Sequence, residues 1–139
     1  MSRTFAGLQY LTGNDCSLLI DRSERKVFGA GEDLIQHGRQ TKVLYLLVRG
    51  RVRIDGQQGT IAHIAEGDVC GEMAFLEDSL PSATAVAEED VEAYALRWEM
   101  LRDLFELFPH LASRFYRSVA VILSQRLRQQ LYRNIPLRN

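Results

Sequence analysis

A glycine, a carboxylate and a later run of small residues form the part of the chain best suited to chemistry. Gly71 follows the strand-like segment 61–64 and opens a short helical turn that continues through Glu72, Met73 and Ala74. The first N–H groups of a helical turn lack partners within the helix, so they can hold a phosphate without a cationic side chain. A carboxylate beside such a phosphate is electrostatically unfavourable unless it accepts a hydrogen bond, for example from a sugar hydroxyl.

Small and hydroxyl-bearing residues follow this turn. Ser82, Ala83 and Thr84 leave space for a ligand and offer hydrogen-bond donors. A phosphate contact, a sugar contact and space for a base together indicate a nucleotide. Simpler interpretations stay open. Glu72 is also a first-turn acid that the helix dipole stabilises, and Ser82 and Thr84 can instead satisfy backbone groups at a strand edge.

At these residues the chain resembles the cyclic nucleotide-binding domain family, the type found in catabolite activator protein and in the regulatory subunit of protein kinase A. Residues 71–76 and 82–84 match the family signature. In an ungapped comparison the family's phosphate-binding arginine falls on Pro81, which has neither a charge nor an N–H. The resemblance implies ligand-binding residues at Gly71, Glu72, Met73, Ala74, Pro81, Ser82, Ala83 and Thr84, with cyclic AMP or cyclic GMP as the candidate ligand.

The resemblance covers most of the chain, roughly residues 15–130. The order of the glycines at 31, 38, 50 and 67 follows the family's pattern of strands and turns. It implies a mainly β fold with flanking helices, namely an antiparallel β-roll (a jelly roll). Short strands separated by glycine-marked turns independently favour an antiparallel sandwich or barrel.

The periodicity divides one domain, residues 1–139, into three segments. Residues 1–25 are expected to form a helical lead-in, residues 26–97 the β-roll, and residues 98–139 the C-terminal helices. Asn14 or Asp15 is expected to cap the first helix.

Residues 44–54 alternate between two faces, with Gly50 marking a bend or an exchange of strands. One face comprises Leu44, Leu46, Val48, Val52 and Ile54, and the other comprises Tyr45, Leu47, Arg49, Arg51 and Arg53. These arginines are expected to face solvent; they would replace the missing charge only if their face turned toward the site. Residues 55–59 predict a hairpin turn.

The last helix is expected to run from about His110 to Asn134 and to be important for function. Leucines spaced by four residues continue through Leu123, Leu127 and Leu131, farther than a barrel of this size covers. We therefore expect a homodimer through this helix, with packing against the barrel alone as the alternative. In the family such a helix closes over the ligand, and in catabolite activator-like proteins a DNA-reading helix-turn-helix follows; none is expected within this chain.

Composition narrows the function classes. The chain has 139 residues, 46% hydrophobic and 25% charged, with a net charge of −1, which is typical of one globular domain. No stretch approaches the roughly 20 apolar residues of a membrane span, and the N-terminus lacks a signal-peptide pattern. The expected location is cytoplasmic. Cys70 is expected to be a small buried side chain, with a redox-sensing thiol as the alternative.

Catalysis and metal binding are not expected. The histidines at 37, 63 and 110 are isolated, so the paired histidines of a cupin metal site are missing, and no catalytic triad or Gly-Lys phosphate loop is evident. No cofactor is expected either. Six arginines and no acidic residue follow Glu106; they predict a solvated helix face, with a nucleic-acid or membrane contact as a minor alternative.

Two hypotheses of different classes follow. In the first, the chain is a regulatory, ligand-binding module of signal transduction whose C-terminal helix couples ligand binding to a partner or to a dimer. In the second, the loss of the arginine at Pro81 has abolished cyclic nucleotide binding, and the domain is a protein–protein or dimerisation module.

Overall fold

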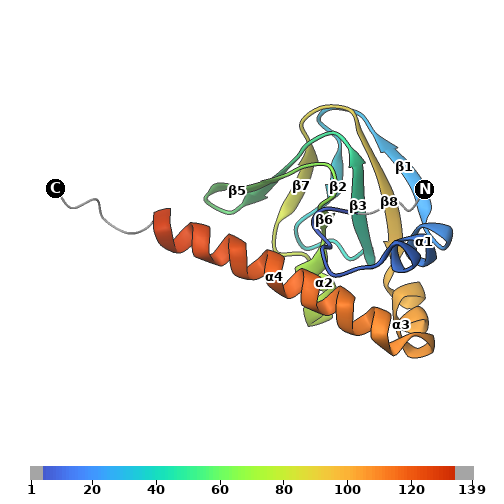
Figure 1. The fold of residues 1–139 in the computed structure, drawn as a ribbon. Helices are drawn as coiled ribbons and strands as arrows, with labels where there is room; N and C mark the ends of the chain where they lie inside the picture. The colour runs from blue at the N-terminus through green and yellow to red at the C-terminus, as the bar shows by residue number, and fades with distance from the viewer. Residues whose placement is uncertain (1–4, 134–139) are drawn as a thin grey trace.

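Two antiparallel sheets face each other and are flanked by helices in the computed structural model of the protein, which describes residues 5–133 (Figure 1). One sheet has the order β1 (Glu24–Phe28), β8 (Val91–Arg97), β3 (Val43–Arg49) and β6 (Val69–Cys70). The other has the order β2 (Asp33–Ile35), β7 (Thr84–Ala87), β4 (Val52–Gly56) and β5 (Gly59–Ile64). The helices are α1 (Gly13–Asp21), α2 (Glu72–Glu77), α3 (Trp98–Leu107) and α4 (Pro109–Arg133). The predicted β-roll with flanking helices is confirmed.

Strand β3 is buried on both faces. Leu44 and Leu46 pack into the core between the first sheet and helices α1, α3 and α4, whereas Tyr45 and Leu47 pack between the two sheets. Because one sheet separates two cores, alternation along β3 does not separate buried from exposed side chains.

Gly50 moves the chain from one sheet to the other, as its place in the sequence pattern predicts. Its φ is +97°, and an added Cβ would lie 2.5 Å from the carbonyl oxygen of Asp90, so only glycine fits. Because of this exchange of sheets, the predicted grouping of Val52 and Ile54 with Leu44 and Leu46 on one face is wrong. Val52 and Ile54 belong to the core between the sheets, with Leu47, rather than to the core of Leu44 and Leu46.

Helix α1 begins two to three residues earlier than predicted. Its N-cap is Thr12, whose hydroxyl accepts from the N–H of Asp15 at 3.1 Å, while the Asp15 carboxylate accepts from the N–H of Thr12 at 2.9 Å. This reciprocal pair is a capping box. Asp15 therefore contributes to the cap, but neither it nor Asn14 is the capping residue.

Helix α4 is long and only its first half is covered. Pro109 occupies the first helical position, where its missing N–H costs nothing. The predicted end at Asn134 lies outside the described residues. Buried positions run from Leu111 to Ile122, Arg126 still contacts α2, and the last turns beyond it project away from the β-roll (Figure 1). None of the helices within residues 5–133 combines the length and the apolar character needed to span a bilayer.

Candidate ligand site at the Gly71–Glu77 turn

Gly71 precedes helix α2 in a conformation that favours glycine. Its φ is +90°, and an added Cβ would lie 2.7 Å from Cδ1 of Ile35. As the N-cap residue, Gly71 has no side chain that could cap the helix. The first N–H groups of α2 therefore remain available to an acceptor near Gly71, which is the property that the sequence predicts for a phosphate site.

Glu72 is buried, and its partner comes from the far end of the chain. The carboxylate accepts a charge-assisted hydrogen bond from Arg126 of α4, whose side chain is 29% exposed. The position of Glu72 in the first turn of α2 was anticipated, but this ion pair was not. The only signal in the sequence was the acid-free arginine run of α4, which needs acidic partners from elsewhere in the chain.

The two halves of the signature meet, but they enclose little space. Gly71, Ala74 and Pro81 line one cavity of about 10 Å³, together with Ile35, residues 40–43 and Trp98. That volume is roughly enough for one water molecule. In this conformation the space between Gly71 and Pro81 is too small for a nucleotide.

The other signature residues lie around this cavity rather than in its wall. Met73 and Ser82 are exposed, and Ala83 is half-buried. The hydroxyl of Thr84 accepts from the N–H of His37 at 3.0 Å, and the carbonyl oxygen of Pro81 accepts from the N–H of Gly38 at 2.9 Å. Thr84 thus has the structural role that its position at a strand edge suggested.

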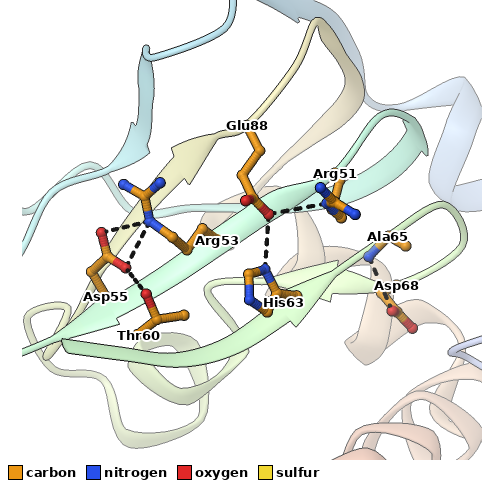
Figure 2. Close-up of polar contacts among 8 residues, drawn as sticks. All are labelled: Arg51, Arg53, Asp55, Thr60, His63, Ala65, Asp68 and Glu88. Carbon is orange, nitrogen blue, oxygen red and sulfur yellow. Dashed lines mark hydrogen bonds and ion pairs between the residues drawn. The ribbon is translucent and has the colours of Figure 1, made fainter.

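Arg51, which directly precedes β4, and Arg53 within β4 lie on the outer face of the second sheet. Arg51 and His63 both contact Glu88, at 3.1 Å and 2.8 Å (Figure 2). Arg53 donates to Asp55 at 2.9 Å, and the hydroxyl of Thr60 donates to the same carboxylate. The contact with His63 and the charge of Arg51 lower the pKa of Glu88. Neither arginine replaces the charge missing at Pro81.

A second buried ion pair joins α4 to α1. Arg114 of α4 donates two hydrogen bonds to Asp15 of α1, at 2.6 Å and 2.9 Å, and the Asp15 side chain is 5% exposed. These hydrogen bonds hold the pKa of Asp15 below its usual value. The hydroxyl of Ser118 also accepts from the N–H of Tyr10, at 3.0 Å. The segment before and within α1 is therefore fixed to the first half of α4.

Cys16 and Cys70 are both buried. Burial raises the pKa of both the Cys16 and the Cys70 thiols, so neither forms a thiolate near neutral pH. The interpretation of Cys70 as a small buried side chain is confirmed.

Comparison with known proteins agrees with this architecture. A family model described as "Cyclic nucleotide-binding domain" matches residues 25–107. The "Cyclic AMP receptor protein" of Thermus thermophilus is 32% identical over 124 residues, which are 86% of this chain and 56% of that protein. This chain therefore spans little more than half the length of that relative.

Solved structures show the same fold. The crystal structure of Thermus thermophilus Catabolite Activator Protein has a TM-score of 0.74 at 29% identity, over 92% of this chain and 61% of that one. A cyclic nucleotide-binding domain from Methylobacillus flagellatus has a TM-score of 0.80 at 23% identity, over 93% of this chain and 76% of that one. With the family match across more than half of the sequence, these likenesses establish that the chain belongs to the cyclic nucleotide-binding domain family.

Proposed function

We propose that this domain is a regulatory module that binds a small ligand of the cyclic nucleotide type at the α2 turn and transmits binding through α4. The ion pair between Glu72 and Arg126 is the observation that carries the proposal. It joins the carboxylate expected to accept a sugar hydroxyl to the helix expected to move.

The burial of Glu72 makes this connection energetically important. Its side chain is 5% exposed, so its charge depends on Arg126 for compensation. Removing one partner of a buried ion pair costs about 3–5 kcal/mol. A ligand hydroxyl that donates to Glu72 adds a second partner and changes how strongly the carboxylate holds Arg126. The position of α4 then depends on whether the site is occupied.

Ligand entry requires the site to open. The cavity at Gly71 and Pro81 is about 10 Å³, whereas small-molecule pockets measure roughly 300–1,000 Å³. Ile35 packs against Gly71 and fills the space beside it. We infer that the described conformation is the unliganded, closed state, and that binding moves β2 and α4 away from the turn.

The second candidate is a domain that binds no cyclic nucleotide and acts as a protein–protein or dimerisation module. Pro81 favours it, because proline supplies neither a charge nor an N–H to a phosphate. A charge-assisted hydrogen bond contributes about 1.5–3 kcal/mol, which corresponds to roughly a tenfold to hundredfold change in affinity. The small cavity also agrees with this candidate.

Isothermal titration calorimetry separates the two. The protein is titrated with cyclic AMP, cyclic GMP and cyclic di-GMP, and Glu72→Gln serves as the site variant. The first candidate, a ligand-binding regulatory module, predicts dissociation constants in the micromolar range. The affinity of Glu72→Gln should be about tenfold lower, because an amide is a poorer acceptor than a buried carboxylate. If none of the three ligands gives a heat of binding, the second candidate is correct, and the domain is a module that binds no cyclic nucleotide.

A further inference from the structure

A groove of about 640 Å³ opens at one end of the β-roll, separate from the α2 turn. Strands β1, β3 and β8 provide its floor, and the start of α3 closes one side. Its lining comprises Glu24, Lys26, Thr41, Lys42, Val43, Tyr45, Ala95, Arg97, Trp98, Glu99, Arg102 and Asp103. This volume is within the usual range for small-molecule pockets, whereas the cavity at Gly71 is not.

The strand register places residues of β1, β3 and β8 side by side in the groove. Ala95 pairs with Tyr45 on β3 and with Glu24 on β1, and Val43 pairs with Arg97. Directly opposed residues point to the same face of a sheet, so all of these side chains line the groove. Tyr45 and Ala95 are buried and form its floor, whereas the exposed side chains of Glu24 and Arg97 form its rim. Burial raises the pKa of Tyr45, so its phenol is neutral and can donate a hydrogen bond.

The strand side of the rim is positively charged. Lys26 and Arg97 each approach Glu24 at 3.7 Å, so two cations share one carboxylate. Lys42 forms no ion pair or side-chain hydrogen bond with any other residue in 5–133. It also has a φ of +54°, a conformation that non-glycine residues rarely adopt. Strained backbone conformations cluster at functional sites, and the exposed ammonium group of Lys42 can contact a ligand anion.

The α3 side of the rim carries the opposite charge. Glu99 and Asp103 lie there, and Arg102 is held by Asp78 at 3.0 Å. A ligand anion is therefore expected at the strand side, near Lys42 and Arg97, with its uncharged part over Val43, Tyr45 and Ala95.

Trp98 connects the groove with the signature. Together with residues 41–43 it lines both the groove and the small cavity at Gly71. Its indole N–H is buried and has no hydrogen-bond partner within the described part of the chain. Trp98 also begins α3, the helix that packs against α4. A molecule in the groove would therefore contact the wall of the signature cavity from outside.

We propose that this groove is a second ligand site, which takes a small organic anion with a flat apolar body. The anionic group, a phosphate or a carboxylate, contacts Lys42 and Arg97, and the apolar body lies on the floor beside Tyr45. This site needs none of the residues of the Gly71–Glu72 turn, so it stands whether or not the domain binds a cyclic nucleotide.

The single tryptophan makes the site directly testable, because Trp98 lies in its wall. Tryptophan fluorescence is followed while the protein is titrated with AMP and with benzoate, which separate the phosphate and carboxylate alternatives. Adenosine and benzyl alcohol are the matched uncharged probes. We expect saturable quenching by one of the two anions, and about tenfold or weaker binding of its uncharged counterpart, since that counterpart lacks the charge-assisted contacts.

Two groove variants and one control complete the test. Lys42→Gly removes the ammonium group at a backbone conformation that favours glycine, so it preserves folding; Arg97→Gln removes the second cation. Each should weaken binding of the anion about tenfold, and Arg22→Gln, an exposed charge outside the groove, should not. No saturable quenching by either anion up to about 10 mM, or equal binding by wild type and both groove variants, overturns the proposal. Pro81→Arg separates the sites, because it should alter cyclic AMP binding and leave the groove probe unaffected.

Discussion

Pro81 is the residue at which this chain departs from the signature of its family. We predict that Pro81→Arg increases affinity for cyclic AMP by roughly tenfold to a hundredfold, because arginine adds a charge-assisted contact to phosphate. Calorimetry measures the change, and Pro81→Gln is the uncharged control. If Arg and Gln variants bind alike, the site is closed by other residues, with Ile35 against Gly71 as the first to test.

Asp15 gives a residue-scale prediction for pH. Its folded pKa lies below the unfolded value of about 3.9, because Arg114 donates to the carboxylate. The resulting stability is therefore fully present above the unfolded pKa, and it is lost as the pH falls through the lower, folded pKa. Asp15→Asn should reduce the free energy of unfolding by about 1–3 kcal/mol at pH 7.

Urea denaturation at pH 7 and at successively lower pH checks this prediction. The difference between wild type and Asp15→Asn should shrink below about pH 4, as the wild-type carboxyl protonates. Asp55→Asn is the matched control, because Asp55 pairs with Arg53 on the exposed outer face and should contribute much less. A difference that stays constant down to pH 2 would mean that the lost stability does not come from the ionised Asp15 carboxylate.

At the scale of elements, α4 combines three roles along one helix. Its first half packs into the core and is tied to α1 through Asp15, its middle reaches Glu72 through Arg126, and its last turns expose apolar side chains. Leu127, Leu131 and Tyr132 are 58%, 57% and 67% exposed. We propose that a second copy of the same helix covers this stripe in a two-fold dimer, since soluble monomers rarely expose such patches.

The dimer proposal predicts that Leu127→Asp produces monomers, because each two-fold contact would bury the new charge against its own symmetry mate. Sedimentation velocity over a range of concentrations measures the change. Val27→Asp is the control, because Val27 is 73% exposed on β1, away from α4. If the wild-type protein stays monomeric at high concentration, the dimer proposal is wrong. The end of α4 would then act as a lid or bind another partner.

At the scale of the whole molecule, the charge is unevenly distributed but partly compensated. The chain has a net charge of −1, with six arginines and no acidic residue after Glu106. Arg114 and Arg126 are engaged by Asp15 and Glu72, so they are not available to a polyanion. We predict that the protein passes through a heparin column at low salt. Retention that falls steeply with added salt would instead indicate a nucleic-acid or membrane surface on α4.

The sequence determined those features that depend on local chemistry. Glycines that need a positive φ fix the turns at Gly50 and Gly71. The switch from strand to helical periodicity places the end of the sheets near Trp98, and the order of these signals specifies the β-roll. Backbone sterics act within a few residues, so their effects can be predicted from the sequence. The candidate residues around Glu72 and Ser82 were found in the same way, by pattern.

Only the tertiary structure decided which distant groups meet. Arg126 pairs with a carboxylate 54 residues away, and Arg114 pairs with one 99 residues away. No local rule selects these two arginines from the six that follow Glu106. The groove at Lys42 was equally inaccessible to sequence reasoning, because its wall comes from β1, β3, β8 and α3. Whether Tyr45 faces a core or solvent depended on a second sheet lying across the first. Local sterics set each element, but burial and charge compensation are properties of the packed molecule.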